Sequence, residues 1–227
     1  MHDDHEHGPH DTLDALEGHA GFVAPRYRSG QRTADALLEA GRALLTRTSY
    51  EALSVSELCK EASLTTGAFY RRFESKESFF LALQRLALDD AALLQQSLLV
   101  RFDNGPDASA SLRELAAIAL EGIRVWYVKH RGVLRASMQR LDHEVGGWRP
   151  FRELGRSVLT ELSNRMMRLP ELESRADALG RLKIAFQIVN GALVNAALND
   201  PGPLRLEDPA LATELAQTFT LYVCAGA

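Results

Sequence analysis

Three helix-capping positions lie close together in the first third of the chain, and they divide that stretch into short helices. Ser54 and Glu57 have the spacing of a capping box, in which the serine accepts a hydrogen bond from an early backbone amide and the glutamate returns to the cap. Thr65 and Ser75 offer two further caps. The helix that begins at Ser54 can therefore hardly extend past Ser63, and one very short helix separates it from a longer one.

Elsewhere the apolar residues recur at the three- and four-residue steps of helices, and no stretch alternates as a half-buried strand would. Runs rich in Asn, Gly and Pro at 103–106 and 199–203 separate the helices. We predict an all-α fold with helices at about 29–48, 54–63, 65–72, from 75 onward, 111–130, 133–141, 150–169, 174–198 and 209–223.

The first 25 residues differ from the rest, because they hold six acids, no Lys or Arg, and five of the seven histidines. They lack a sustained apolar period, so we predict a mostly disordered acidic, His-rich tail. Its histidines, together with nearby carboxylates, could hold zinc or nickel; they are His2, His5, His7 and His10. A solvated tail is favoured, because an unfolded segment loses conformational entropy when it builds a site. We therefore expect no metal and no cofactor.

The cysteines and the hydropathy pattern indicate in which cellular compartment the protein is found. Cys59 and Cys224 lie far apart and fit neither a disulfide framework nor a cysteine metal motif. No apolar run reaches the length of about 18 residues that suggests a membrane span. We expect a cytoplasmic protein with no membrane partner.

The capped corner between 54 and 75 has the layout of a helix-turn-helix, in which two short helices meet at a steep angle so that the second can enter the DNA major groove. A small apolar core is predicted from Val55, Leu58, Leu64, Phe69 and Phe73. The other side carries hydroxyl, amide and basic groups that can bind phosphates and base edges, from Thr65, Thr66, Gly67, Ala68, Tyr70 and Arg71. Arg72 and Lys76 can reach flanking phosphates.

The run ASLTTGAFYRRFESKE at 62–77 resembles the DNA-binding signature of the TetR family of bacterial transcriptional regulators, and the likeness covers about residues 31–80. It implies recognition contacts from Thr65, Thr66, Gly67, Ala68 and Tyr70, with Ser54 and Lys76 on phosphates. One departure is Ser63, which stands where the family usually has glycine and must either adopt the same backbone at some cost or relax the turn slightly. The implied layout is a DNA-binding domain at 26–80 followed by an effector-binding and dimerisation domain at 81–227.

A homodimer and a small-molecule effector are also implied by this resemblance. Small and large apolar residues on the last two long helices suit a four-helix interface: Ala185, Ile188, Val189, Ala192, Leu193, Ala196, Leu211, Leu215 and Phe219. Aromatic, flexible and polar residues of the middle helices suit an effector pocket: Trp126, Tyr127, His130, Met138, His143, Trp148, Phe151, Met166, Phe186, Gln187 and Asn190.

Two other functions compete with a ligand-responsive repressor. A metal-responsive repressor would use the N-terminal histidines, and an all-helical metal enzyme would need ligand pairs such as Glu-x-x-His. His130 and His143 do not form such a pair, and the sequence has no Gly-rich phosphate loop, nucleophile elbow or His-Glu-x-x-His motif. No catalytic residues are expected.

Overall fold

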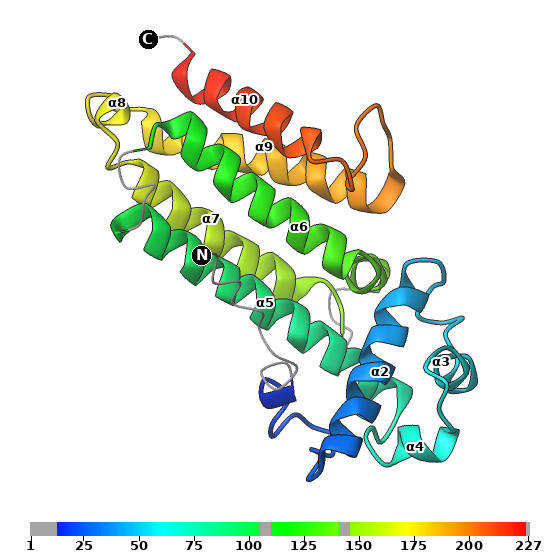
Figure 1. Ribbon diagram of the computed structural model, residues 1–227. Coiled ribbons are helices and arrows are strands. Elements are labelled where there is room, and N and C mark those ends of the chain that lie inside the picture. The colour runs from blue at the N-terminus through cyan, green and yellow to red at the C-terminus, as the bar shows by residue number, and fades with distance from the viewer. Residues whose placement is uncertain (1–12, 105–109, 141–145, 226–227) are drawn as a thin grey trace, which may run out of the picture. The chain divides into compact units, whose positions relative to one another are not determined.

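The computed structural model describes residues 13–104, 110–140 and 146–225, and every regular element within them is a helix (Figure 1). The predicted all-α fold is confirmed. The chain divides into two compact units, of which the first comprises Met1–Asp89 and Gly132–Trp148 and the second Asp90–Arg131 and Arg149–Ala227. The first unit therefore includes a segment that lies far along the chain from its other residues.

The first unit contains the helices predicted from the caps: α2 (Arg28–Leu45), α3 (Val55–Glu61), α4 (Thr66–Tyr70) and the start of α5 (Lys76–Asn104). The Ser54 capping box is formed, because the Glu57 amide donates to Ser54 Oγ at 3.1 Å and the Ser54 amide donates to Glu57 Oε2 at 3.2 Å. Thr65 Oγ1 accepts from the Ala68 amide at 3.2 Å. Local hydrogen bonds thus set where these short helices begin.

The core of the first unit is aromatic. Phe69, Phe73, Phe79 and Phe80 are fully buried, and the ring centroids of Phe69 and Phe73 lie 5.6 Å apart. Leu58 is buried as predicted, whereas Val55 and Leu64 are only half-buried.

The predicted tail needs correction at residues 13–25. Leu13 and Leu16 are buried, the Phe22 ring lies 5.3 Å from that of Phe73, and the Val23 amide donates to the Arg72 carbonyl at 2.8 Å. Apart from a short helical stretch at residues 13–14, these contacts come from turns and irregular chain, which have no helical period that the sequence could show. The histidine cluster at residues 2–10 lies outside the described residues.

The break predicted between 130 and 133 is also wrong, because α6 runs unbroken from Leu112 to Gln139. Gly132 lowers helix propensity but permits a close approach, since a Cβ atom there would lie 2.6 Å from the carbonyl carbon of Leu45. The last part of α6 belongs to the first unit.

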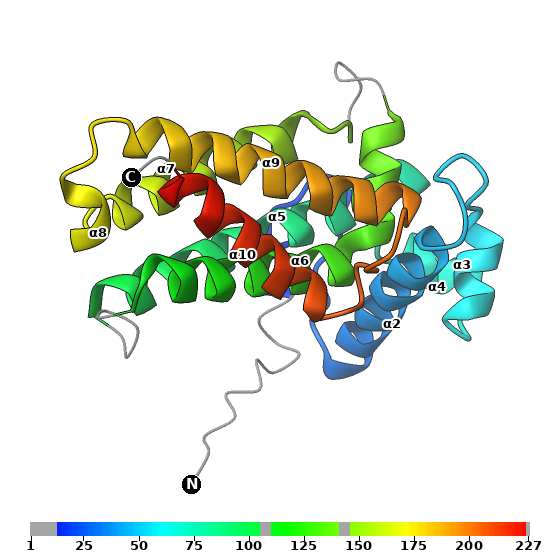
Figure 2. The same ribbon diagram turned by 90° about the horizontal axis from the view of Figure 1, so that it is seen from above.

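The second unit contains the remaining parts of α5 and α6 together with α7 (Arg149–Met166), α8 (Pro170–Glu173), α9 (Ala178–Asn199) and α10 (Ala210–Cys224). Helices α9 and α10 lie side by side in both views, and α7 packs on α9 (Figures 1 and 2). The rings of Phe186 and Phe219 join α9 to α10 at 4.7 Å. Among the described residues, no helix is long and apolar enough to cross a membrane.

Candidate nucleic-acid interface

Helix α4 has one buried face and one exposed face. Phe69 is fully buried, and the Tyr70 ring stands edge-on against it with centroids 5.2 Å apart, yet Tyr70 is 59% exposed. The exposed face carries hydroxyl, phenol and guanidinium groups beside a glycine: Thr65, Thr66, Gly67, Tyr70 and Arg71. These groups can donate to phosphate oxygens and to acceptors on base edges.

The corner that aims α4 is made by Ser63, whose φ is 55°. The Ser63 amide donates to the Lys60 carbonyl at 3.1 Å, and the next amide, of Leu64, donates to the Cys59 carbonyl at 2.8 Å. Of the two expected alternatives, Ser63 thus adopts the left-handed backbone that glycine favours. A left-handed serine is strained, so the surrounding packing must hold it.

Three residues predicted to contact DNA have side chains that instead make contacts within the protein. Ala68 is 6% exposed and packs inward, which contradicts its expected place on the open side. The Ser54 hydroxyl is bound to the Glu57 carboxylate at 2.7 Å. Lys76 Nζ lies within 3.3 Å of three backbone carbonyls, those of Tyr50, Glu51 and Leu53. That ammonium group therefore fixes the loop before α3.

Arg72 also turns inward, unlike Arg71. Its Nη1 lies 3.5 Å from the Val23 carbonyl, and its Nη2 occupies the space that a side chain on Gly30 would fill. Burial, and then the charge of Arg71, lower the pKa of Arg72. The sequence did not predict the bond to Val23, because Val23 lies in the segment that was expected to be disordered.

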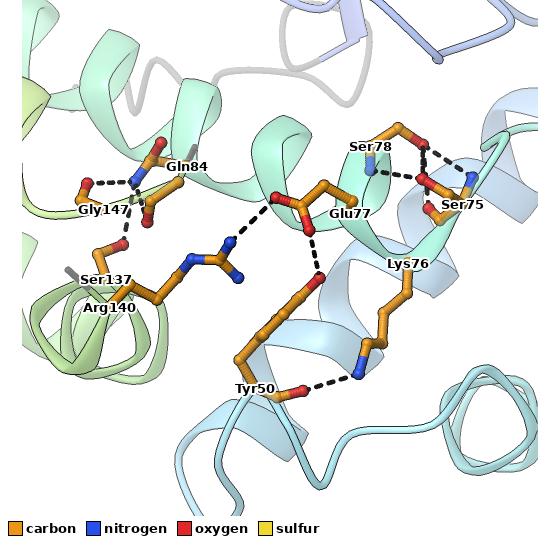
Figure 3. A network of polar contacts seen from close by, with 10 residues as sticks. Tyr50, Ser75, Lys76, Glu77, Ser78, Gln84, Ser137, Arg140 and Gly147 are labelled. Atoms are coloured by element: carbon orange, nitrogen blue, oxygen red, sulfur yellow. Dashed lines mark hydrogen bonds and ion pairs between the residues drawn. The ribbon is translucent and has the colours of Figure 1, made fainter. Parts of the chain in front are cut away.

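A polar network joins the start of α5 to the segment 132–148 (Figure 3). Glu77 accepts from the Tyr50 hydroxyl at 2.9 Å and from Arg140 Nη2 at 3.1 Å. Gln84 Nε2 lies 3.1 Å from Ser137 Oγ and from the carbonyl of Gly147. The network holds the distant segment within the first unit.

Arg135 adds a second attachment of that segment. Its Nη2 donates to the carbonyls of Leu45 and Thr48 at 3.2 and 3.1 Å, which lie at and just beyond the end of α2. Carbonyls at a helix C-terminus have no partner within the helix, so a guanidinium there satisfies them. No local sequence pattern indicates this contact, since the partners are some ninety positions apart.

Some predicted effector residues do gather in the second unit. The Trp126 ring contacts those of Tyr127, His130 and Phe151 at 5.1, 5.8 and 6.1 Å. The Tyr127 hydroxyl donates to Asn190 Oδ1 at 3.1 Å, and burial raises the pKa of Tyr127. The Tyr127 hydroxyl therefore already has a partner inside the unit.

The sequence analysis did not single out Asp90, although its carboxylate contacts two basic side chains beside this cluster. Its Oδ2 lies 2.8 Å from Nε2 of the buried His130 and 2.6 Å from Nζ of Lys129. Burial would raise the pKa of Asp90, but hydrogen bonds and charges from His130 and Lys129 lower it to about 2. The carboxylate is thus held ionised.

The other predicted pocket residues do not join this cluster. Met166 and Phe186 are buried in the core, and Gln187 is exposed on α9. Met138 and Trp148 belong to the first unit. His143 lies outside the described residues.

A hollow of about 440 Å³ lies elsewhere in the second unit, between α5 and α6, and none of the predicted pocket residues lines it. Its walls are mainly apolar, with polar groups from a serine, an arginine and a glutamate: Leu94, Ser97, Leu98, Arg101, Ala117, Ile118, Glu121 and Gly122. Within the described parts of the chain, no group of three or more His, Cys, Asp or Glu could hold a metal ion.

The residues predicted for a dimer interface divide by burial. Most are covered inside the chain, where they join α9 to α10 or to the core: Ala185, Val189, Leu193, Ala196, Leu211 and Phe219. Ala192 and Leu215 are half-buried, and Ile188 is 48% exposed. Two further apolar side chains on these helices are open, Ile184 and Leu221, and the sequence pattern did not single them out.

Comparison with known proteins agrees with this geometry. Residues 37–83 match the sequence profile of a family described as bacterial regulatory proteins, tetR family. The fold resembles the fatty acid degradation regulator FadR from Bacillus halodurans, with TM-score 0.61 and 16% identity over 86% of this chain and 96% of that one. It also resembles a transcriptional regulator from Aquifex aeolicus, with TM-score 0.55 and 20% identity over 83% and 98% of the two chains.

A TetR-family regulator from Bordetella parapertussis is similar at TM-score 0.53 and 16% identity, covering 82% of this chain and 93% of that one. No curated protein sequence matches the chain significantly. The structural likenesses concern the fold, since the identities are low.

Proposed function

Because residues 37–83 match the tetR family of bacterial regulatory proteins, we propose that this chain is a transcriptional regulator of that family, which binds a near-palindromic DNA operator as a homodimer, represses transcription, and is released by a small-molecule effector. The DNA-binding part rests on one observation: α4 presents its polar groups outward over a fully buried aromatic face. We place its action in the cytoplasm, where the DNA of a bacterium lies.

The exposed face of α4 suits the major groove. Thr65 and Thr66 offer hydroxyls, Tyr70 a phenol and Arg71 a guanidinium, and Gly67 allows the backbone to approach closely. A side chain added at Gly67 would meet only Thr65 Oγ1 at 3.8 Å and Arg71 Nη1 at 4.0 Å. No contact within the protein therefore requires a glycine at position 67. We propose that a glycine is needed there so that a base edge can approach the backbone.

The dimer is proposed to form through the outer faces of α9 and α10. Ile184, Ile188 and Leu221 are large apolar side chains left open on these neighbouring helices. Covering such side chains with a second copy would remove them from water, which favours association. Two recognition helices related by a twofold axis would then read two half-sites about one helical turn apart.

The effector is proposed to bind in the second unit. Two places there are candidates: the aromatic cluster around Trp126 and the hollow between α5 and α6. Both are mainly apolar, so they fit a largely apolar molecule. Release from DNA requires that the effector bind one conformation of the dimer more tightly than the other.

The test of this function is binding of the full chain to the DNA upstream of its own gene, measured at two salt concentrations. A variant with Thr66→Ala and Tyr70→Ala should lose its preference for that DNA over a random duplex, because both side chains are exposed and support no core contact beyond the Tyr70 edge. Thr160→Ala, on an exposed site of α7, is the matched control and should bind normally. Equal preference in the double variant, at unchanged melting temperature, would refute reading by α4.

A further inference from the structure

The segment immediately before and at the start of α2 is unusually open and basic. Arg26, Tyr27 and Arg28 are all exposed, and Tyr27, at 77%, is more open than Tyr70 on the recognition helix. From residue 26 to residue 34 the chain has three arginines and no acid. Aromatic rings are usually at least partly covered, so an open phenol between two arginines suggests a surface that is covered in a complex.

This segment is fixed beside the end of the recognition helix. On its N-terminal side, the Val23 amide donates to the Arg72 carbonyl at 2.8 Å, and Phe22 forms a bridge with Phe73. On its C-terminal side, Gly30 lies against the guanidinium of Arg72. Residues 26–28 are therefore held between two attachments to the chain that directly follows α4, and the start of α2 and α4 lie at the same end of the first unit in Figure 1.

Tyr27 and Arg28 do not stabilise the start of α2, so helix stability does not explain their presence there. Tyr27 occupies the N-cap position without a side-chain cap hydrogen bond, and the first turn has no acid. Serine, threonine, aspartate and asparagine are the residues that favour an N-cap, and a basic side chain in the first turn opposes the helix dipole. Arg72 turns inward among these residues, whereas Arg26, Arg28 and Arg71 are exposed.

We propose that Arg26, Tyr27 and Arg28 form a second DNA contact, on the sugar-phosphate backbone beside the bases that α4 reads. Guanidinium groups bind phosphates with charge-assisted hydrogen bonds, and the phenol can donate one neutral bond. The contact extends the face of Thr66, Tyr70 and Arg71 and rests on the proposed function. Because phosphates carry no sequence information, this second contact adds affinity equally on operator and random DNA.

Salt-dependent binding tests the proposal, with one duplex selected from a random library by the wild-type protein and one unselected duplex of equal length. Arg26→Ala with Arg28→Ala should lower the slope of log affinity against log salt by roughly 3.6 on both duplexes, at about 0.9 for each of the four phosphate contacts that the dimer loses. Arg26→Lys with Arg28→Lys should retain the slope. Tyr27→Phe should weaken binding to both duplexes without changing the slope.

The control removes the same charge elsewhere. Arg113 and Arg156 are exposed in the second unit, and Arg113→Ala with Arg156→Ala should leave the slope unchanged. An unchanged slope in the Arg26 and Arg28 variant, or an equal fall in the control, would overturn the second contact while leaving reading by α4 intact. Absence of any selected sequence with wild type would instead refute the proposed function, and the second contact with it.

Discussion

The hydroxyl of Tyr50 donates a 2.9 Å hydrogen bond to Oε2 of Glu77, and this pair joins the loop before α3 to the first turn of α5. The same tyrosine ring lies 4.5 Å from the Lys76 ammonium and 4.7 Å from the Arg140 guanidinium. Glu77 in turn accepts from Arg140 (Figure 3). One aromatic residue thus connects α5, the loop 50–53 and the segment 132–148 within the first unit.

Tyr50→Phe tests the hydroxyl apart from the ring. The phenylalanine keeps the contacts with both cations but leaves Glu77 with one donor fewer, so unfolding should become easier by about 1 kcal/mol. Tyr50→Ala also removes a buried ring and should cost about 3–5 kcal/mol. Urea unfolding measures both. Equal losses in the two variants would contradict a structural role for the ring and its cations.

Gly132→Ala should destabilise the protein although it lies inside α6. The added Cβ would stand 2.6 Å from the Leu45 carbonyl carbon and 2.7 Å from the Thr46 amide nitrogen, and backbone atoms cannot move aside cheaply. Gly155→Ala, inside α7, meets nothing within 4 Å and should stabilise by roughly 0.5–1 kcal/mol through helix propensity. Thermal melting of both variants checks the opposite signs, and a gain for Gly132→Ala would show that the close approach is absent.

Ser63→Gly should relieve the backbone strain of the corner. At φ 55° a serine costs roughly 1–2 kcal/mol, and glycine returns part of this through its freer unfolded chain, so a net gain of up to about 1 kcal/mol is expected. Ser56→Gly, at an exposed helical site in α3, should lose up to about 1 kcal/mol instead. Denaturant midpoints measure the pair, and two losses would argue against the left-handed corner.

Acid should expose the role of Asp90. Its pKa in the folded protein is about 2, below the ordinary value of 3.8, so its ionised form contributes stability above pH 4 that is lost as pH falls toward 2. The stability difference between wild type and Asp90→Asn should therefore shrink over that range. Since the carboxylate is 32% exposed, the contribution is at most roughly 2 kcal/mol. A difference that stays constant from pH 5 to pH 2 would contradict the pairing.

Ile188→Glu should separate the proposed dimer. A charge at the centre of the open face of α9 would be buried without a partner on association, which costs several kcal/mol. Val125→Glu, on a similarly open side chain of α6, is the control and should remain dimeric. Sedimentation velocity across a range of protein concentrations distinguishes them. A wild-type monomer throughout, or a dimer in the Ile188 variant, would rule out this face.

The sequence by itself determined the short helices and the polar face of α4. Ser54, Thr65 and the strained Ser63 act on residues three to five positions away, and such local hydrogen bonds depend on residue type and spacing. The helical class followed for the same reason, because apolar periodicity is a property of each segment alone.

Only the tertiary structure decided which polar groups are free. Arg71 and Arg72 are neighbours with the same side chain, yet one is open and the other is turned toward Val23. Lys76 is occupied by the carbonyls of the loop 50–53, and the segment 132–148 joins the first unit through Arg135 and Arg140. These outcomes depend on groups between 23 and 90 positions apart in the chain, and no local pattern encodes which of them the packing brings together.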